Sequence, residues 1–294
     1  MSERNKLGLF CNIPAEDVVV ALDVDNIYKV PLAYHAEGLD VQVLKHFHMY
    51  ESAPEPDLSK WEEIVQILSN YEKEVKIAVV GKYCGLLEAY KSLHEALAHA
   101  GIANRAKVKI SWIESEQLES LSDEELSATL KPFDGILVPG GFGVRGIQGK
   151  IRAIQYAREN NVPFFGICLG MQMAVIEAAR HLLGIENASS AEFGTKCEPV
   201  ISKMKVWEKD GVQYIRQDNG DLGGTMRLGA YPCVLTENSL AEKIYGCNQI
   251  RERHRHRYEM DIAYEKPLAA KGVMSSGKSH DGLFPEIIEI LLHP

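Results

Sequence analysis

The residues best suited to chemistry surround Cys168, in the run Gly166-Ile167-Cys168-Leu169-Gly170. This run joins an apolar segment, residues 162–167, to a helix-like segment that begins at Met171. Glycines two positions before and two positions after a nucleophile permit the sharp strand-to-helix turn that raises a nucleophile above a parallel sheet. The dipole and free N–H groups of a helix N-terminus lower the pKa of a thiol. The run therefore predicts an activated cysteine nucleophile.

The other five cysteines are expected to be small core residues, because unpaired cysteine is among the most buried residue types. No two of the six cysteines form a Cys-x-x-Cys pair or show zinc spacing, so the sequence predicts no metal site. These five are Cys11, Cys84, Cys197, Cys233 and Cys247.

A glycine-rich turn one strand-helix unit before Cys168 is suited to stabilising negative charge. A thiolate that attacks an amide creates an oxyanion, which needs N–H donors already in place. The turn Pro139-Gly140-Gly141-Phe142-Gly143 presents backbone N–H groups with no side chain in the way. The residue after the nucleophile, Leu169, is the second expected donor. A Gly-Gly pair alone also suits a structural turn, but its place in the chain favours an oxyanion hole formed by Gly141 and Leu169.

The run of alternating arginine and histidine at residues 251–257 has three interpretations. A metal site at His254 and His256 is disfavoured because the neighbouring arginines repel a cation. A nucleic-acid patch is disfavoured because the run is short and the chain is acidic. In an extended strand, Arg253, Arg255 and Arg257 share one face and can clamp a carboxylate or phosphate. A solvated charged strand remains the default for some of these residues.

Composition restricts the class of protein. The chain has 294 residues, of which 46% are hydrophobic and 25% charged, as in ordinary globular domains. The net charge of -9 argues against binding DNA or RNA. The longest nearly apolar stretch, residues 162–176, is too short to span a bilayer, so no membrane association is expected. Scattered cysteines without a secretory leader predict a reducing, cytoplasmic compartment.

Strands and helices that alternate from Val75 onward must position these groups. Such alternation is typical of a doubly wound, mainly parallel α/β sheet with flanking helices, in which sites lie at the carboxyl ends of the strands. A capping box at Ser122 and Glu125 begins a short helix, and Gly101 is expected to end a helix. Strands are expected at 75–80, 108–113, 135–138 and around 164, and longer helices at 86–100, 147–160 and 171–183.

The N-terminal part has a different organisation. Residues 1–50 are expected to form a small unit with apolar runs at 7–11 and 41–47 and a helical piece near 15–22. Residues 51–60 carry two prolines and no periodicity, which indicates a linker. Helical spacing follows over residues 61–69. The region after about residue 183 is less regular.

Four motifs together resemble those of the CTP synthase family. The glycine turn and the Cys168 run are shared by class I glutamine amidotransferases in general, whereas the last two motifs are more specific. Residues 6–12 and 23–31 also resemble the C-terminal end of the family's synthetase (amidoligase) domain. The four motifs occupy residues 139–143, 166–172, 221–229 and 252–259.

The resemblance implies a domain organisation and a reaction. Residues 1–50 would be the remnant of a second α/β domain, the synthetase, residues 51–74 a linker and linker helix, and residues 75–294 a flavodoxin-like glutaminase. The family hydrolyses glutamine and passes the ammonia to UTP, which ATP has activated, to make CTP. ATP with Mg²⁺ serves the full-length enzyme and GTP activates it, while no cofactor is expected to bind this chain tightly. The family forms homotetramers through the synthetase domain, so this fragment is expected to be monomeric.

Carried over residue by residue, the resemblance assigns the nucleophile to Cys168 and a nucleotide phosphate contact to Lys6. The oxyanion and glutamine loop contains Gly141. Glu192 would meet the substrate's α-ammonium, and Arg257 would order the pocket or meet the carboxylate. The remaining assignments are glutamine binding by Leu169, Gly170, Met171 and Gln172, and ATP contact by Leu22, Asp23 and Val24.

The catalytic base is where this sequence departs from the family pattern. The family's His-Pro-Glu segment is expected to follow the last residues of this chain, so His293 is not expected to be the base. Nothing local marks His280 either, although it would be the replacement if the chain proved active. Without the base, a loss of ~10²–10⁴-fold in rate is expected.

Two alternatives remain open at the level of sequence. Without its base, the chain could act as a glutamine-binding module that docks on a synthetase domain. It could also be the glutaminase of another amidotransferase, such as GMP synthase, although the motifs at 6–31 and 251–257 disfavour that reading.

Overall fold

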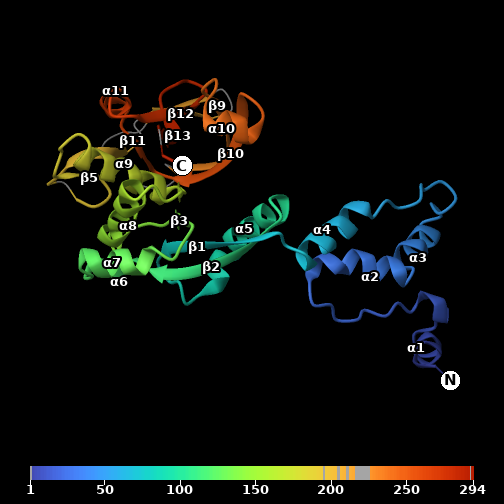
Figure 1. The fold of residues 1–294 in the computed structure, drawn as a ribbon. Helices are drawn as coiled ribbons and strands as arrows, with labels where there is room; N and C mark the ends of the chain where they lie inside the picture. The colour runs from blue at the N-terminus through green and yellow to red at the C-terminus, as the bar shows by residue number, and fades with distance from the viewer. Residues whose placement is uncertain (1, 195, 204–205, 210–211, 216–225, 292) are drawn as a thin grey trace. The chain divides into compact units, whose positions relative to one another are not determined.

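The computed structural model describes residues 2–194, 196–203, 206–209, 212–215, 226–291 and 293–294. The chain divides into two compact units. The first unit comprises residues 1–74 and 95–108, and the second comprises residues 75–94 and 109–294. Figure 1 labels the elements of each unit.

The first unit is built from helices. From residue 2 to residue 50, the structure contains only helical elements and the segments between them. The helical piece predicted near 15–22 is wrong beyond its first turn, because the β-branched run Val18-Val19-Val20 disfavours continuing the helix. The elements are α1 (Glu3–Cys11), η1 (Ala15–Asp17), η2 (Ile27–Lys29), α2 (Val30–Ala36), α3 (Leu39–His46) and α4 (Ser59–Ser69).

Aromatic contacts hold part of this unit together. The Tyr28 ring lies 6.5 Å from the Trp61 ring and 6.0 Å from the His99 ring, measured between centroids. The Tyr28 hydroxyl and His99 Nε2 form a hydrogen bond of 2.7 Å. The helix predicted over 61–69 is confirmed as α4. These contacts tie η2 to α4 and to residues 95–108.

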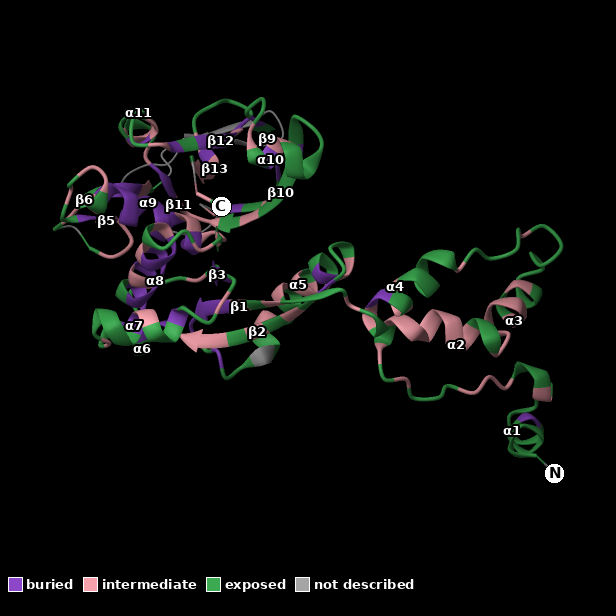
Figure 2. Ribbon diagram, in the orientation of Figure 1, coloured by how far each residue is buried: buried purple, intermediate pink, exposed green. Residues whose placement is uncertain are grey.

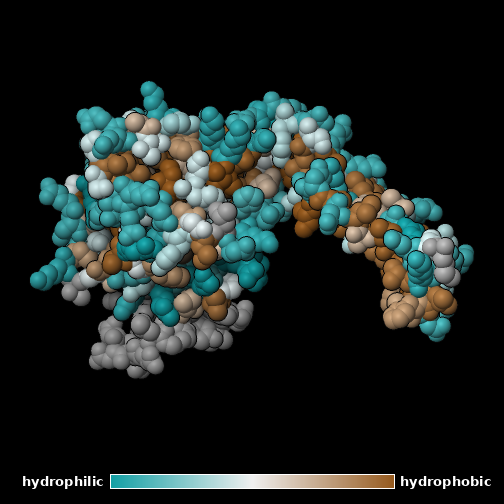
Figure 3. Space-filling model, turned by 90° about the horizontal axis from the view of Figure 1, so that it is seen from below, coloured by the Kyte–Doolittle hydropathy of each residue, from teal (hydrophilic) through white to brown (hydrophobic). Residues whose placement is uncertain are grey.

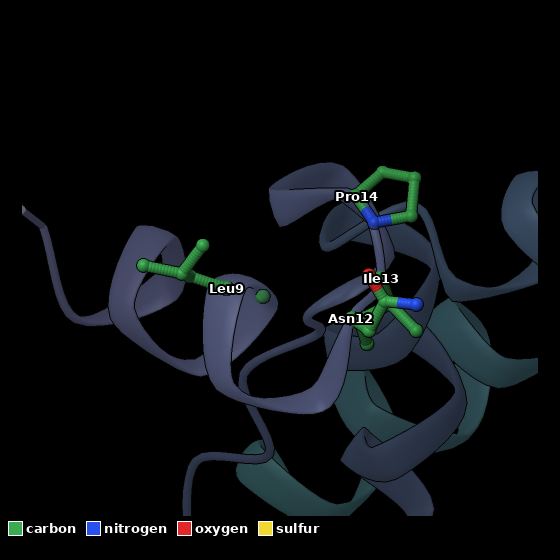
Figure 4. Close-up of a pocket in the computed structure, with 5 residues that line it drawn as sticks. Leu9, Asn12, Ile13 and Pro14 are labelled. Carbon is green, nitrogen blue, oxygen red and sulfur yellow. The ribbon is translucent and has the colours of Figure 1, made fainter.

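Much apolar surface of the first unit faces solvent. Leu9, Phe10 and Leu22 are 75%, 90% and 73% exposed. Figure 2 shows mainly green and pink residues on α1 to α4, and Figure 3 shows brown apolar atoms there. An open hollow beside α1 is lined by Leu9, by Gly8 and by the segment Asn12-Ile13-Pro14 (Figure 4). The unit therefore has only a weak core of its own.

The second unit contains the predicted parallel sheet, in the strand order β2-β1-β3-β4. Strand β3 pairs in parallel with both β1 and β4. The predicted strands and the capping box that starts α7 are confirmed. The strands are β1 (Lys73–Gly81), β2 (Ala106–Glu114), β3 (Gly135–Val138) and β4 (Phe164–Gly166), with helices α6 (Ser115–Glu119), α7 (Asp123–Leu130), α8 (Ile147–Glu159) and α9 (Leu169–His181) and the turn η3 (Leu87–Tyr90). Most of helix α5 (Lys91–Ala103) and the start of β2 fall in residues 95–108, which belong to the first unit.

Gly101 does not end its helix, contrary to prediction. Helix α5 continues to Ala103. A Cβ atom at Gly101 would lie 2.6 Å from the carbonyl oxygen of Ala106, where β2 begins. The glycine is therefore required for close packing of the helix against the start of the strand.

The main core cluster lies around β1, β3, α8 and α9, whose buried parts are purple in Figure 2. Most of α9 is buried, including Met173, Val175 and Ile176. This burial explains the apolar residues of the stretch from Leu169 onward, whereas the strand β4 before them is only partly buried and Phe165 is 62% exposed. None of the described helices is long and apolar enough to cross a membrane.

The region after α9, which the sequence analysis described only as less regular, forms several sheets. Strands β5 (Ala188–Ser190), β6 (Glu198–Lys203) and β11 (Tyr258–Met260) form one sheet, and β7 (Val206–Lys209) pairs with β8 (Val212–Ile215). A four-stranded antiparallel sheet has the order β10-β9-β12-β13. Its strands are β9 (Arg227–Leu235), β10 (Gln249–His256), β12 (Val273–Ser279) and β13 (Pro285–Ile290), accompanied by α10 (Leu240–Tyr245), η4 (Ile262–Tyr264) and α11 (Glu265–Ala269).

Candidate active site

Three neighbouring strands bring the candidate groups to one edge of the parallel sheet. Strand β1 ends at Gly81, directly before Lys82. Strand β3 ends at Val138, before the loop of residues 139–146, and strand β4 ends at Gly166, two residues before Cys168. The carboxyl ends of parallel neighbours meet at the same edge, and a site is expected there. The loop 140–143 is called the glycine loop below.

Cys168 occupies the sharp turn that its flanking glycines predict. It is the N-cap of α9, with φ 54° and ψ -107°, a conformation that side-chain-bearing residues rarely adopt. A Cβ at Gly166 would lie 2.6 Å from the carbonyl carbon of Gly170. A Cβ at Gly170 would lie 2.0 Å from the carbonyl oxygen of Val138. Both glycines are therefore required by close backbone contact.

The glycine loop lies against the nucleophile. A Cβ at Gly140 would lie 3.4 Å from Cys168 Cβ and 3.9 Å from its Sγ. A Cβ at Gly141 would lie 3.3 Å from Leu169 Cδ2. The two residues predicted to form the oxyanion hole, Gly141 and Leu169, are thus neighbours beside Cys168.

The thiol of Cys168 is less acidic than the helix N-terminus alone predicts. Burial raises the pKa of Cys168, and the nearby carboxylates of Glu259 and Glu192 raise it further. A hydrogen bond from the Leu169 N–H and the charge of Arg255 lower the pKa, but by less. The expected depression of this pKa is therefore corrected, because desolvation disfavours the thiolate. The site needs a proton acceptor or a bound cationic group to form the nucleophile.

Opposite charges hold the two ends of one peptide group in the glycine loop. Lys82 Nζ donates to the Phe142 carbonyl oxygen. The N–H of Gly143 donates to Glu192 Oε1 at 2.8 Å. Glu192 follows β5, so a residue assigned to the substrate's ammonium also contacts the backbone of the loop.

Two lysines lie buried beneath the glycine loop. A Cβ at Gly141 would lie 3.7 Å from Lys82 Cε and 3.9 Å from Lys150 Nζ. Burial lowers the pKa of Lys82, and the charge of Arg145 lowers it further. Burial also lowers the pKa of Lys150 to about 8, with a smaller effect from Lys82. Positive charge is therefore concentrated behind the predicted oxyanion hole.

The first turn of α9 is anchored to a distant strand. Gln172 Nε2 donates to the carbonyl oxygen of Tyr258 at 2.9 Å. Gly170 is buried and its N–H donates to the Ile167 carbonyl oxygen, while Met171 is half-buried. Gln172, one of the residues assigned to glutamine binding, therefore joins helix α9 to β11.

The arginine-histidine run changes sheets at Arg257. Strand β10 pairs with β9, and after Arg257 the chain enters β11, which pairs with β6. Arg255 lies over the Phe142 ring, 6.0 Å from its centroid. Arg257 Nε is buried and has no hydrogen-bond partner among the described residues. Arg255 therefore lies close to the glycine loop, and Arg257 lies at the change of sheet.

A buried ionic cluster lies behind this run. Arg227 donates to Glu259 at 3.3 Å and forms a close ion pair with Glu286. Nδ1 of His254 and Nε2 of His256 lie 2.8 Å apart. The cluster, which we call the Arg227 cluster, consists of Arg227, His254, His256, Glu259 and Glu286.

The histidines of the Arg227 cluster are held neutral. Burial and the charge of Arg227 lower the pKa of His254 to about 3 and that of His256 to about 4. Burial raises the pKa of Glu259 to about 8, against the opposing charge of Arg227. Among the described residues no group of acidic, histidine and cysteine side chains is arranged to hold a metal ion. The histidines therefore contribute packing and neutral hydrogen bonding to the cluster.

The two late histidines, His280 and His293, have different surroundings. His280 is exposed. His293 Nε2 lies 3.1 Å from the Ala157 carbonyl oxygen, in the last turn of α8. Helix α8 begins beside the glycine loop, so ten residues at 1.5 Å each place Ala157 about 15 Å along the helix from that end.

The residues assigned to the nucleotide lie in the first unit. Lys6 is exposed on α1, and Leu22 and Asp23 are exposed in the segment between η1 and η2, where Val24 is half-buried. In the motif at 221–229, residues 221–225 lie outside the described part of the chain. All six cysteines are free; Cys84 and Cys233 are buried as predicted, whereas Cys11 and Cys247 are exposed.

Sequence reasoning missed Lys82, Lys150 and the Arg227 cluster. The available signal for Lys82 was its position immediately after the β1 strand, at the same edge as Gly140 and Cys168. Lys150 had no comparable signal, because a lysine inside an amphipathic helix is normally exposed. The partners Arg227, Glu259 and Glu286 are far apart in the chain, and only the antiparallel pairing brings them together.

An elbow cysteine beside a glycine loop, on a parallel sheet with α/β crossovers, defines the class I glutamine amidotransferases. A family model described as "Glutamine amidotransferase class-I" matches residues 85–291, and one described as "CTP synthase N-terminus" matches residues 1–49. The curated relatives include CTP synthase of Zymomonas mobilis, 56% identical over 100% of this chain and 54% of the relative. CTP synthase of Agrobacterium fabrum is also 56% identical, over 100% of this chain and 53% of the relative.

A solved structure agrees with these matches. The glutaminase domain of Trypanosoma brucei CTPS with bound acivicin superposes with a TM-score of 0.63 at 37% identity, over 74% of this chain and 79% of that one. The chain belongs to the CTP synthase family and contains its glutaminase domain. It spans about half the length of the curated relatives it matches.

Proposed function

We propose that this chain carries out the glutaminase step of CTP synthesis. Cys168 Sγ attacks the side-chain amide carbon of glutamine, and the resulting oxyanion accepts hydrogen bonds from the N–H groups of Gly141 and Leu169. The proton lost by the thiol is transferred to the amide nitrogen, which leaves as ammonia when the C–N bond breaks, and water then hydrolyses the thioester to glutamate and the free thiol. The observation that carries this proposal is the contact of the glycine loop with the strained Cys168 turn.

Substrate recognition follows from the charges around the turn. Glu192 uses Oε1 for Gly143 N–H, which leaves lone pairs on its carboxylate for the substrate's α-ammonium. Arg257 carries a buried Nε without a partner among the described residues, and it is suited to the substrate's α-carboxylate. Burying the ammonium group near Cys168 would also favour the thiolate, whose pKa is raised in the free site.

The ammonia is consumed by a second reaction in the family. We place that reaction, amination of UTP to CTP with ATP and Mg²⁺ and with GTP as activator, in the larger protein of which this chain matches about half. In the first unit, Lys6 would contact a nucleotide phosphate and Leu22, Asp23 and Val24 would contact ATP. We also place the protein in the cytoplasm, because six free cysteines suit a reducing compartment.

Covalent labelling tests the nucleophile. Acivicin, the ligand of the T. brucei domain, should add once to this chain at Cys168, as measured by intact and peptide mass spectrometry. Glutamine should protect against labelling. Cys168→Ala should abolish the adduct, whereas Cys247→Ala, which removes an exposed cysteine, should not change it. An adduct elsewhere, or one unaffected by glutamine, would contradict the proposal.

Ammonia release separates turnover from binding. Glutamine hydrolysis by this chain that is lost in Cys168→Ala would support catalysis. Glutamine binding measured by calorimetry without any ammonia release would instead support the binding-module alternative. The raised pKa of Cys168 adds a pH signature. Alkylation by iodoacetamide should increase nearly tenfold for each pH unit between 7 and 9, because only the thiolate reacts.

A further inference from the structure

One peptide group in the glycine loop is held by charged side chains at both of its polar ends. Lys82 Nζ donates to the carbonyl oxygen of Phe142, and the N–H of Gly143 donates to Glu192. This carbonyl and this N–H belong to the same planar amide, so the two contacts fix the orientation of its plane. Rotation of the plane would break both contacts together.

The glycine loop needs such restraint because its own sequence supplies little. Gly140, Gly141 and Gly143 carry no side chains, and Gly143 has φ 77°. Glycine-rich backbone reaches many conformations at similar free energy. An oxyanion hole, however, acts only if its N–H donors are already aimed at the developing charge. External contacts must therefore select the productive conformation.

Lys82 is well placed to select it. The residue follows β1, whose last residues are buried in the core, so its backbone is rigidly held. The residue is 9% exposed and its side chain runs beneath Gly141, with Cε 3.7 Å from the position a Cβ would take there. The negative charges of Glu192 and Glu116 offset part of the cost of burying this ammonium.

We infer that Lys82 is a positioning residue for the oxyanion hole, which it maintains by holding the Phe142 carbonyl while Glu192 holds the adjoining N–H. The inference rests on the proposed glutaminase function. Lys82 can act in this way without touching the substrate, because its ammonium group holds the Phe142 carbonyl from a position beneath Gly141. Its effect on the reaction passes through the backbone to Gly141.

Two alkylating reagents distinguish loop geometry from thiol reactivity. The chloroketone analogue of glutamine presents a carbonyl whose oxygen becomes an oxyanion when Cys168 attacks. Iodoacetamide is attacked at its methylene carbon and needs no oxyanion hole. The ratio of the two second-order rate constants at Cys168, measured by mass spectrometry, therefore reports the oxyanion hole.

We expect Lys82→Met to lower the chloroketone rate constant by about 10–100-fold, below the loss on removing a donor outright. The iodoacetamide rate constant should change by less than about threefold, because this reaction needs the thiolate alone. Lys82→Arg keeps a cationic donor and should recover most of the ratio. Lys91→Met, at an exposed lysine, is the matched control and should have the wild-type ratio.

A wild-type ratio in folded Lys82→Met would overturn the inference. If Lys82→Met does not fold, Lys82→Gln decides, because its side chain is one bond too short to reach Phe142. The same loss is expected there, and a wild-type ratio would again overturn the inference. Failure of the proposed function has a different signature: wild-type Cys168 would react with the chloroketone without protection by glutamine.

Discussion

Close backbone contact, rather than side-chain chemistry, shapes the Cys168 turn at the scale of single residues. Gly170 packs directly on the carbonyl group of Val138, with no room for a methyl group. Helix α9 thereby approaches β3, and its N-terminus is placed behind the nucleophile.

We expect Gly170→Ala to destabilise the second unit by about 3 kcal/mol or more, because its Cβ would lie 2.0 Å from Val138 O, a backbone atom of β3 that cannot move aside easily. Urea unfolding measures the change. Gly85→Ala is the control, since nothing lies within 4 Å of its Cβ position. Equal stability of the two variants would contradict this account of the turn.

Burying the charged side chain of Lys150 has a measurable cost in stability. Its pKa of about 8 lies below the ordinary 10.5, so the unfolded chain holds the proton more tightly than the folded one. The free energy of unfolding should therefore rise as pH increases from about 8 to 10.5, and the full cost of burying the charge should be present below about 8.

Lys150→Met removes that pH dependence. At pH 7 the variant should be more stable than wild type by up to about 3 kcal/mol, since one pKa unit corresponds to about 1.4 kcal/mol. The difference should shrink at pH 9.5 and above. Urea unfolding at both pH values tests this, and a less stable variant at pH 7 would show that Lys150 makes a compensating contact.

The sequence predicts the Cys168 turn and the glycine loop because both are local patterns of residue type and spacing. It does not predict the raised pKa of the thiol, because helix-dipole reasoning omits the burial that the surrounding strands impose. Nor does it predict Lys82, whose contact with Phe142 spans 60 residues. The residues that position the site are thus harder to find than the residues expected to react.

At the scale of elements, the change of sheet at Arg257 depends on the Arg227 cluster. Arg227 on β9 joins Glu259 on β11 to Glu286 on β13, so one buried cation links strands of two sheets. Strand β10 pairs with β9 beside this linkage and carries Arg255 over the Phe142 ring.

Arg227→Met should destabilise the second unit by about 3–5 kcal/mol at pH 8, because two buried carboxylates lose their common partner. Glu259 already has its pKa raised to about 8, so its contribution to stability is lost as pH rises toward that value. The loss in Arg227→Met should accordingly be smaller at pH 5, where both carboxyls are protonated more readily.

The double variant Arg227→Met with Glu286→Gln is the matched control, because it removes one of the two charges. It should recover part of the stability at pH 8 in urea unfolding. If Arg227→Met lost as much stability relative to wild type at pH 5 as at pH 8, packing rather than charge would determine the loss.

Elements were predictable where hydrophobic periodicity and local signals agree. The capping box of Ser122 and Glu125 and the buried run of β3 are examples, since each is decided within a few residues. The antiparallel sheet of β9, β10, β12 and β13 was not predictable in the same way, because its pairing depends on contacts between residues far apart. Gly101 is an intermediate case. The sequence marks this glycine, but its packing role becomes visible only when the position of Ala106 is known.

At the scale of the whole molecule, the two units differ in how much apolar surface they bury. The second unit buries a large cluster of apolar side chains around its parallel sheet and a smaller one on its antiparallel sheet, whereas Phe10 and Leu22 of the first unit are 90% and 73% exposed. Apolar surface of this kind binds hydrophobic dyes and favours association.

Phe10→Ser with Leu22→Ser should reduce the fluorescence of bound anilinonaphthalene sulfonate and leave the melting temperature within about 2 °C of wild type, since exposed side chains add little to folding. Differential scanning calorimetry and dye titration measure the two effects. Acivicin labelling of Cys168 should be unaffected, because both changes lie outside the second unit. A large fall in melting temperature would show that these side chains are buried in solution.

The backbone of Cys168 has a consequence for natural variation. Its positive φ suits glycine better than any residue with a side chain. Replacing Cys168 with glycine should therefore raise the free energy of unfolding by about 1 kcal/mol relative to Cys168→Ala. A variant that has lost the nucleophile would thus persist as a well-folded protein.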